Sequence, residues 1–231
     1  MELKASGVKK VFQRAGGRRF SAVETLIFAL PPKTLTEITG RSGSGKSTLL
    51  LMLAGLLPPS EGKVTLDGRD LYALKDGELS KLRNEKIALI PQEHSALASL
   101  TVLENVLLPD ALYGRAADEA RAMNLLERLG IGALWDEMPS AFSGGELRRA
   151  AIARALYQDT PVLLADEPTG DLDEENTKRV LQILREEAQG GKAVLLVTHE
   201  AAAQAYADKV YRMDGGICRA DDCNSGNDTV Q

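Results

Sequence analysis

Eight consecutive residues have the composition and spacing of a phosphate-binding loop. Residues 40–47 read GRSGSGKS and fit the pattern G-x-x-x-x-G-K-[ST] at every fixed position. The β-branched segment TLTEIT precedes the loop and the apolar segment KSTLLLMLAGLL follows it, so we expect a strand before the loop and a helix after it. Backbone N–H groups of such a loop, together with the helix N-terminus, form a cradle for phosphate. The predicted phosphate-binding residues are Gly40, Arg41, Ser42, Gly43, Ser44, Gly45, Lys46, Ser47 and Thr48.

Two side chains of this loop can do more than its backbone. Lys46 is placed to reach the β- and γ-phosphates of a nucleotide, and Ser47 is placed to coordinate Mg²⁺. A glycine-rich connection without a ligand would need neither side chain, and average residue frequencies make a chance match in a chain of this length a roughly one-per-cent event. The pattern therefore indicates nucleotide chemistry.

Two adjacent carboxylates follow another apolar strand pattern. The segment VLLADE ends in Asp166 and Glu167, and the tip of a parallel strand delivers such groups to the sheet edge where α/β proteins bind ligands. We expect Asp166 to join the Mg²⁺ ligands and Glu167 to polarise the water that attacks the γ-phosphate. Because Pro168 follows, we also expect extended backbone geometry at Glu167. The alternative is that Asp-Glu-Pro merely ends the strand.

A third apolar strand pattern, AVLLVTHE, reaches its end at His199. An imidazole beside phosphate can hydrogen-bond the γ-phosphate and orient water. A lone histidine is more often an ordinary surface or core residue, and the chain has one other, His94. The position of His199 at a strand tip, beside the strand that carries Asp166, favours a role at the phosphate.

Strand and helix patterns alternate at both ends of the chain. Between about residues 95 and 155 they give way to three helical patterns, with apolar residues at three- and four-residue spacing. The near-continuous apolar strands VLLA and AVLLV are typical of a parallel sheet covered on both faces, and GKVTLDGRDL predicts either a hairpin or a strand and a turn around residues 67–68. We therefore predict an α/β fold of the P-loop nucleotide-hydrolase class, with a mostly parallel core sheet, an antiparallel β portion and an inserted helical subdomain.

The composition restricts the class of protein further. The 231 residues carry a formal charge of −5, which argues against a nucleic-acid partner bound over a broad basic surface. No apolar run reaches the roughly 18 residues of a membrane span, and the N-terminus lacks the apolar core of a secretion signal. We expect Cys218 and Cys223 to be free thiols, because two thiols without a nearby histidine make a poor zinc site. The polar stretch 221–231 is expected to be disordered.

A second glycine-rich helix start lies downstream of the first. Ser143-Gly144-Gly145-Glu146 precedes the helical pattern LRRAAIARALY, and Ser143 is placed to cap that helix. The exposed N–H groups of this helix start also suit an anion. Taken alone, however, a plain helix cap with a glycine hinge is the better interpretation of this segment.

Together these motifs resemble those of the ATP-binding cassette (ABC) ATPases. Residues 142–146, FSGGE, resemble the signature segment of that family, Gln92 after the KIALIP strand matches its glutamine loop, and residues 168–173, PTGDLD, match the loop after its catalytic glutamate. The motifs follow in family order, and the resemblance extends over about residues 3–220. It implies a single ABC ATP-binding domain over residues 1–220, with the helical subdomain inserted at about 95–155.

The resemblance further implies an ATPase in which two copies of the chain face each other head to tail. The phosphate loop of one copy and the signature segment of the other would enclose each ATP, so each anion site in one chain would be half of a complete site. Asp171 and Asp173 would lie in a loop that crosses the dimer seam. The residues implied to contact the ATP of the partner are Ser143, Gly144, Gly145 and Glu146.

Catalytic roles follow from the same resemblance. Glu167 is implied as the general base and His199 as a γ-phosphate contact, while Gln92 touches Mg²⁺ or the attacking water and senses the membrane partner. An aromatic ring near the N-terminus would stack on the adenine; we favour Phe12, with Phe20 as its rival. The implied Mg²⁺ ligands are Ser47, Gln92 and Asp166.

A finer pattern, SLTVLENVLLP followed by LADEPTGDLD, looks like the branch of lipoprotein-release, macrolide-efflux, cell-division and antimicrobial-peptide-resistance ATPases. It implies a chain on the cytoplasmic face of the cell membrane that powers a separately encoded permease, whose coupling helix would dock on residues 97–112. The apolar residues of that segment equally serve as subdomain core.

The alternative function is a soluble ABC ATPase of DNA repair, chromosome organisation or translation, although such chains usually carry coiled-coil inserts, zinc modules or a second cassette. A GTPase would want an Asn-Lys-x-Asp base reader, which we do not find.

Several residues depart from the family pattern. Residues 31–33, PPK, stand where these proteins usually have a glycine turn, and Asp171 stands where this branch often has asparagine. Glu146, Leu147 and Arg148 replace glutamines that are common around the signature segment. None of these changes removes a catalytic group.

Overall fold

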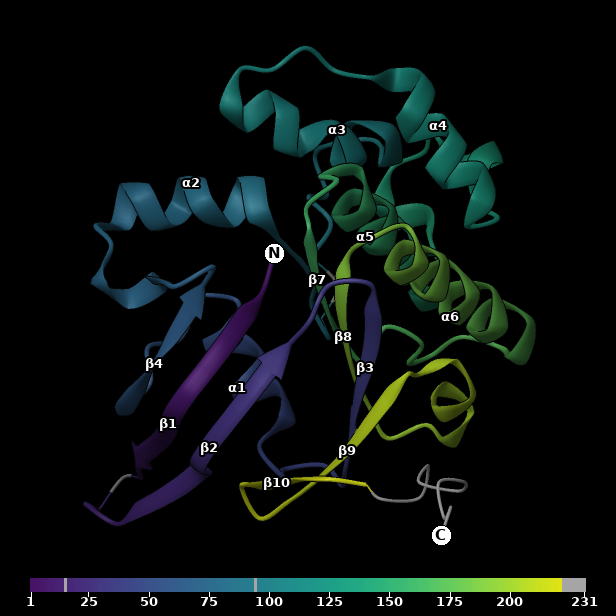
Figure 1. Cartoon of the computed structure of the whole chain (residues 1–231). Coiled ribbons are helices and arrows are strands. Elements are labelled where there is room, and N and C mark those ends of the chain that lie inside the picture. Colours follow the sequence, from purple (N-terminus) through teal and green to yellow (C-terminus); the bar gives the residue numbers. More distant parts are fainter. Residues whose placement is uncertain (15, 94, 222–231) are drawn as a thin grey trace, which may run out of the picture.

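Two β-sheets enclose a central helix in the computed structural model, which describes residues 1–14, 16–93 and 95–221 (Figure 1). The first sheet is antiparallel throughout, with the strand order β2-β1-β4-β5. Its strands are β1 (Leu3–Gln13), β2 (Arg19–Leu30), β4 (Glu61–Leu66) and β5 (Arg69–Asp70).

The second sheet has the order β10-β9-β3-β8-β7-β6. All neighbouring pairs in it are parallel except β10 and β9 at one edge. Its strands are β3 (Thr34–Thr39), β6 (Ile87–Ile90), β7 (Val162–Asp166), β8 (Ala193–Thr198), β9 (Lys209–Asp214) and β10 (Ile217–Ala220). The mostly parallel core sheet and the antiparallel portion predicted from the sequence are both present.

Helices connect and cover these sheets. The α-helices are α1 (Lys46–Leu53), α2 (Asp76–Lys86), α3 (Val102–Tyr113), α4 (Glu119–Arg128), α5 (Gly144–Tyr157) and α6 (Glu174–Gln189). Short 3₁₀ turns are η1 (Leu71–Ala73), η2 (Gly132–Leu134), η3 (Pro139–Ala141) and η4 (Ala201–Tyr206). None of the helices in the described residues has the length and hydropathy that a membrane span requires.

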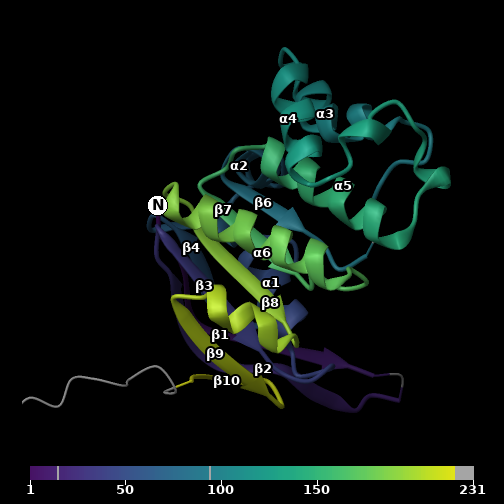
Figure 2. The same cartoon turned by 90° about the vertical axis from the view of Figure 1, so that its right-hand side faces the viewer.

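Alternate residues of the core strands face two different hydrophobic clusters. On β7, Leu164 packs with α1 and the first sheet, whereas Leu163 packs with α3, α4, α5 and α6. Figure 2 shows the resulting layers, with α3 and α4 farthest from the two sheets and α5 between them and the core sheet. Because both faces of β7 and β8 are covered, all their residues are buried, which explains their unbroken apolar sequences.

The parallel register brings the carboxyl ends of four strands to one edge of the core sheet. Thr39 at the end of β3 is level with Thr198 at the end of β8, and Asp166 of β7 is level with Val197. Ile90, the last residue of β6, is level with Ala165. The segments that follow these four ends carry the predicted chemistry, so strand pairing alone gathers it in one place.

Local backbone geometry corrects the expected end of the helix after the phosphate loop and accounts for the unusual PPK segment. The helix after the phosphate loop was expected to run to residue 57, but α1 ends at Leu53 because Gly55 adopts φ +70° and the Leu56 N–H bonds to the Leu51 carbonyl. In the PPK segment, Lys33 has φ +57°. Lys33 thus takes a left-handed geometry that glycine adopts more readily, which agrees with the glycine turn expected in this segment from the resemblance.

Some predictions lie beyond what the structure describes. Cys223, His94 and residues 222–231 of the polar tail lie outside the described residues. Cys218 is a free thiol on β10. The domain limits 1–220 and the insert limits 95–155 stay predictions.

Candidate active site

A pocket of about 710 Å³ opens at the carboxyl edge of the core sheet. Its walls come from the phosphate loop, from the segments after β6, β7 and β8, from the β1–β2 hairpin and from the β9–β10 turn. The lining residues are Phe12, Phe20, Ser21, Ala22, Arg41, Ser42, Gly43, Ser44, Gly45, Lys46, Ser47, Thr48, Gln92, Glu167, His199, Gly215 and Gly216. The sequence-predicted Phe12, Gln92, Glu167 and His199 therefore meet the phosphate loop in one cavity.

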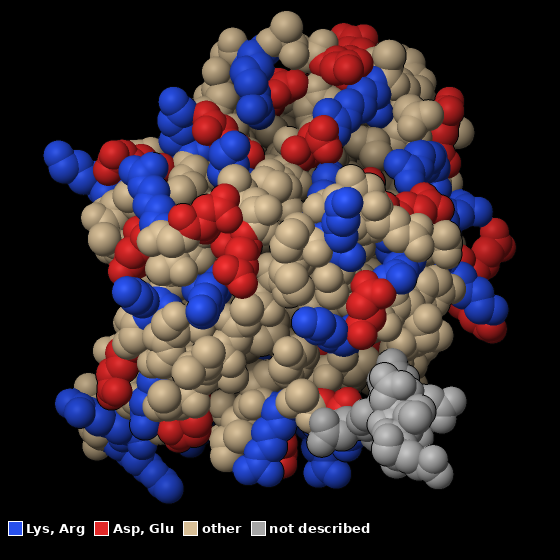
Figure 3. All heavy atoms as spheres, viewed as in Figure 1, with Lys and Arg blue, Asp and Glu red and all other residues tan. Residues whose placement is uncertain are grey.

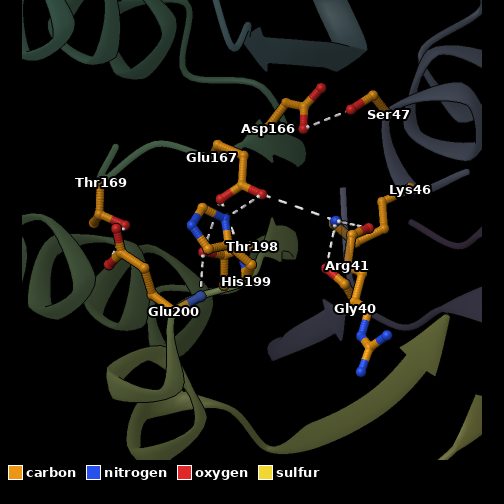
Figure 4. Close-up of polar contacts among 10 residues, drawn as sticks. All are labelled: Gly40, Arg41, Lys46, Ser47, Asp166, Glu167, Thr169, Thr198, His199 and Glu200. Atoms are coloured by element: carbon orange, nitrogen blue, oxygen red, sulfur yellow. Dashed lines mark hydrogen bonds and ion pairs between the residues drawn. The ribbon is translucent and has the colours of Figure 1, made fainter. Parts of the chain in front are cut away.

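The lysine of the phosphate loop is hydrogen-bonded to backbone carbonyls of the same loop. The Lys46 ammonium donates hydrogen bonds to the carbonyls of Gly40 at 2.7 Å and Arg41 at 3.2 Å, and the residue is only 6% exposed (Figure 4). Gly45, the N-cap of α1, has φ +107°, and a Cβ there would lie 2.1 Å from the Ala22 carbonyl oxygen. Only glycine fits this position, because a side chain would collide with the first sheet.

Two oxygen-bearing side chains meet at the base of the loop. The Ser47 hydroxyl donates to Asp166 Oδ1 at 3.1 Å, which joins the start of α1 to the end of β7 (Figure 4). Burial raises the pKa of Asp166, and the neighbouring charge of Glu167 raises it further, against the lowering effects of the Ser47 hydrogen bond and of Lys46 and Arg148. Asp166 is thus a buried acid that gains from an added cation.

Glu167 is held from one side by the end of β8. Its carboxylate accepts hydrogen bonds from the Thr198 hydroxyl at 3.0 Å and from the His199 backbone N–H at 3.3 Å, and it contacts His199 Nδ1 at 3.0 Å. The Lys46 ammonium lies 3.9 Å away on the other side. Figure 4 shows the carboxylate between these partners, so its direction is fixed by at least three groups.

The backbone of Glu167 differs from the sequence expectation. Extended geometry was expected because Pro168 follows, but Glu167 has φ +47° and its carbonyl accepts the Gly170 N–H in a turn. The Glu167 N–H still pairs with the Val197 carbonyl at 2.8 Å. The contacts that fix the carboxylate outweigh the local preference, and a strained residue of this kind is typical of a functional site.

Sequence reasoning missed three polar residues beside Glu167 and His199. Thr198 is fully buried and also accepts the Glu200 N–H, while the Thr169 hydroxyl donates to the Glu200 carboxylate at 2.8 Å. These bonds tie the loop after β7 to the loop after β8 (Figure 4). The polar segment THE at the end of an apolar strand was the available signal.

Two aromatic rings form the far wall of the pocket. The centroids of Phe12 and Phe20 are 5.8 Å apart on paired positions of β1 and β2. The Lys10 ammonium lies 5.3 Å from the Phe12 ring, and the Arg14 guanidinium lies 4.8 Å from the Phe20 ring. Both candidates for base stacking therefore line the cavity, and the choice of Phe12 over Phe20 stays a prediction.

A separate pocket of about 280 Å³ lies at the N-terminus of α5. The Ser143 hydroxyl and the Glu146 side chain form a capping box, in which Glu146 also accepts the Ser143 N–H at 2.8 Å. Arg149 donates to Asn176 of α6 across this pocket. The lining residues are Ser143, Gly144, Gly145, Arg149, Asp171, Leu172, Asp173 and Asn176. The predicted signature and seam residues thus come together, apart from the first pocket.

The ABC transporter family profile matches residues 23–170 of the chain. The lipoprotein-releasing system ATP-binding protein LolD of Aquifex aeolicus (strain VF5) is 40% identical over 216 residues, which make up 93% of this chain and 94% of that protein. The macrolide export ATP-binding/permease protein MacB of Shewanella sp. (strain W3-18-1) is 36% identical over 222 residues, or 95% of this chain and 34% of that protein. The chain therefore spans about a third of the length of MacB and nearly all of LolD.

Solved structures agree with these relatives. The dimeric structure of MJ0796, a bacterial ABC transporter cassette, superposes with a TM-score of 0.87 at 32% identity, covering 93% of this chain and 95% of that one. A dimeric post-hydrolysis state of MJ0796 bound to ADP and Pi gives 0.88 at 31% identity, covering 94% and 98%. The predicted fold class, ATPase activity and transporter branch are confirmed. This chain belongs to the ABC transporter family, as an ATP-binding and ATP-hydrolysing subunit.

Proposed function

We propose that this chain binds ATP with Mg²⁺ in the first pocket and hydrolyses it against the second pocket of another copy, thereby driving a membrane-spanning permease. One observation carries this proposal. The first pocket combines a phosphate loop, a serine–aspartate pair and a glutamate fixed toward the loop lysine, whereas the glycine-rich start of α5 lies in a pocket of its own.

In this proposal the chain's own groups orient the reactants. Lys46 turns from the loop carbonyls toward the β- and γ-phosphates. Glu167 accepts a proton from the attacking water, because Thr198 and the His199 N–H already hold its carboxylate in place. His199, 67% exposed in its side chain, contacts the γ-phosphate and Gln92 lies beside the water. The ring of Phe12 stacks on the base.

The residues present fit a magnesium ion. Mg²⁺ prefers oxygen ligands and keeps several waters or substrate phosphates, so it needs few side chains from the protein. Ser47 and Asp166 supply two such oxygens 3.1 Å apart, and Gln92 lines the same pocket. When bound, the ion would neutralise charge on the β- and γ-phosphates. Burial is the first cause of the raised pKa of Asp166, and a bound cation would favour the ionised form of this carboxyl.

The second copy is proposed from the two pockets and from the relatives. The N-terminus of α5 is suited to an anion, but Arg149 is the basic side chain in its pocket, and the pocket has no counterpart of the phosphate-loop lysine among the described residues. Both MJ0796 structures are dimeric. Head-to-tail pairing would add Ser143 and its neighbours to the triphosphate in the partner, with Asp171 and Asp173 at the seam.

The membrane partner is proposed to dock on a third pocket. This groove of about 310 Å³ lies between α2 and the C-terminal ends of α3 and α5. Leu56, Leu112 and Tyr113 line it and are 49%, 70% and 42% exposed. By contrast, Val102 and Val106 of the same insert are buried in the core. Because Arg83 and Arg154 also line it, the groove fits an amphipathic helix of a permease at the cytoplasmic face of a membrane.

The surface supports a protein partner over a nucleic acid. Figure 3 shows basic and acidic side chains interspersed over the face that it presents. The formal charge of the chain is −5. A nucleic-acid site would need a continuous basic surface.

Substitution of Glu167 by glutamine tests this proposal. Glu167→Gln should bind ATP with wild-type affinity. It should hydrolyse ATP at least about 100-fold more slowly than wild type, because the attacking water loses its base. The trapped ATP should hold two chains together, which light scattering after size exclusion would detect. Glu174→Gln on α6, whose side chain is 84% exposed, is the matched control and should change neither property. Wild-type turnover, or a monomer in saturating ATP, would contradict the proposal.

A further inference from the structure

Gln92 lies on a short segment that follows β6 and belongs to no helix or strand. We call this the glutamine segment and define it by its described residues, Pro91, Gln92, Glu93 and Ser95. Gln92 is exposed and lines the first pocket. Because strand pairing does not hold this segment, the side chain of Gln92 keeps a fixed place at the pocket only if other elements bond to the backbone around it.

Two arginines of α5 bond to the two ends of the glutamine segment. The Arg148 guanidinium donates from Nη1 to the Pro91 carbonyl at 2.8 Å. The Arg154 guanidinium donates from Nη1 to the Ser95 carbonyl at 2.9 Å and from Nη2 to the Ser95 hydroxyl. Gln92 comes directly after the first of these two anchoring points and before the second.

The spacing of the two arginines suits the length of the segment. Arg148 and Arg154 are six residues apart on α5, which corresponds to about 9 Å along the helix axis. Four residues, the separation between positions 91 and 95, can span at most roughly 13 Å when fully extended. One helix can therefore bond to both ends of the segment without stretching it.

The burial of Arg148 indicates that its guanidinium has a specific task. The residue is only 4% exposed, and its Nε has no hydrogen-bond partner among the described residues. Burying a guanidinium costs free energy that an apolar side chain of similar volume would not cost. Packing of α5 alone therefore does not call for an arginine at this position. The bond that Arg148 supplies is the one to the Pro91 carbonyl, next to Gln92.

We propose that Arg148 and Arg154 are positioning residues, which hold the glutamine segment at both ends and thereby keep Gln92 beside the attacking water. The proposal rests on the function proposed above. Neither arginine is among the described residues that line the first pocket, so both act through Gln92. When one bond is lost, Gln92 should occupy its productive position less often, whereas the phosphate loop still binds ATP. The loss should therefore fall on kcat and not on nucleotide affinity.

A double-mutant cycle with Gln92 tests this route in the full-length chain. The four proteins are wild type, Arg148→Met, Gln92→Ala and the double variant. Arg148→Met should lower kcat about fivefold in the wild-type chain but less than about twofold in the Gln92→Ala chain, because a side chain that is missing cannot be misplaced. The Kd of a fluorescent ATP analogue should change less than about twofold on this substitution. Arg154→Met should behave in the same way.

Losses that multiply in the double variant would overturn the proposal, since the arginine would then act by a route other than Gln92. Wild-type kcat in either Arg148→Met or Arg154→Met would overturn it as well. Arg128→Gln is the matched control, because it removes an arginine of the exposed Arg128–Glu186 pair on α4 and should leave kcat unchanged.

A spin label on the glutamine segment gives a readout that does not depend on turnover. A nitroxide attached at Glu93→Cys, in a chain whose Cys218 and Cys223 are replaced by alanine, reports the mobility of an exposed position next to Gln92. Electron paramagnetic resonance spectra recorded without nucleotide should sharpen when either arginine of α5 is replaced and should stay unchanged in the control variant. Unchanged spectra in the arginine variants would contradict the proposal.

Ser95→Ala keeps the test decisive if an arginine variant does not fold. It removes one acceptor of Arg154 at a partly buried loop position, where loss of a hydroxyl should not prevent folding. It should lower kcat about twofold in the wild-type chain, with no further loss in the Gln92→Ala chain, and it should also sharpen the spectrum. If neither changes, the proposal is rejected. A wild-type chain without ATPase activity would count against the proposed function, while the spectra would still decide whether the arginines hold the segment.

Discussion

The N-termini of α1 and α5 both contain or follow glycines and both line pockets, but the backbone N–H groups of the two helix starts have different partners. Gly45 precedes α1, and no side chain of the described residues caps that helix. Ser143 precedes α5 and caps it, with Glu146 completing the capping box. The start of α1 leaves its N–H groups to a ligand, whereas the start of α5 satisfies part of its own.

An acid next to each pocket shows a similar contrast. Burial raises the pKa of Asp166, which bonds to Ser47 of the first pocket. Hydrogen bonds from the Ser143 hydroxyl, and then from the Ser143 N–H, lower the pKa of Glu146 beside the second pocket. A cation bound beside Asp166 would favour the ionised form of that carboxyl, whereas the bonds from Ser143 already favour the ionised form of Glu146.

The largest effect expected from this comparison is on nucleotide affinity. Lys46→Ala should weaken ATP binding by about 100-fold, because the loop loses a charge-assisted hydrogen bond to phosphate. Ser143→Ala, at the second pocket, should leave the affinity of a dilute single chain unchanged and lower turnover instead. Titration of a fluorescent ATP analogue at low protein concentration measures the first effect, and a phosphate-release assay measures the second. Equal affinity losses in both variants would erase the distinction between the pockets.

A smaller effect is expected on the stability of the nucleotide-free protein. Because the folded-state pKa of Asp166 is raised, its ionised form is disfavoured by folding and reduces stability at pH values above its unfolded pKa. Asp166→Asn keeps an acceptor for the Ser47 hydroxyl and should raise the thermal midpoint at neutral pH by roughly 2 °C. The stabilisation that ATP and Mg²⁺ give to wild type should disappear in this variant. Calorimetric scans with and without nucleotide test both points, and a lower midpoint without nucleotide would show that the charge of Asp166 is already well compensated.

The smallest effect concerns the capping box. The folded-state pKa of Glu146 is lowered from 4.5, so its contribution to stability is complete above that value and is lost as the pH falls through the folded-state pKa. Wild type should therefore unfold less readily than Glu146→Gln at about pH 6, and this difference should vanish as the pH falls through the lowered folded-state pKa of Glu146. Ser143→Ala removes the main cause of the shift and should move this loss to higher pH. Urea titrations at a series of pH values would follow it, and a difference independent of pH would assign the effect to packing.

Much of the fold could be predicted from continuous or periodic apolar residues. β7 and β8 are buried on both faces, so their sequences are continuously apolar. The start of α5 could be predicted from the capping residue Ser143. The strands β1 and β2 were missed because bulges near Ala5, Val8 and Lys10 shift their register and break the alternation. The helix α2 was missed because it buries only Leu79 and Asn84, which leaves no apolar stripe.

The residues of the candidate site could be predicted where a motif requires a particular residue type at a fixed position. Lys46, Asp166 and Glu167 meet because β3, which leads into the phosphate loop, and β7, which ends at Asp166, are both parallel neighbours of β8. The φ of Glu167 could not be predicted, since it depends on bonds from Thr198 and His199 that the tertiary structure creates. The burial of Arg148, which is only 4% exposed and donates to the Pro91 carbonyl, could not be predicted either. An arginine near a polar helix start normally faces water.

The helix α5 runs from the second pocket to the groove at its other end, where Arg154, Ala155 and Gln158 form part of the wall. Its 14 residues make a rod about 20 Å long. A tilt of roughly 5° about one end of such a rod moves the other end by nearly 2 Å, which is enough to make or break a hydrogen bond. A force applied at the groove can thus tilt α5, and the resulting movement of its N-terminus changes whether Ser143 reaches a phosphate.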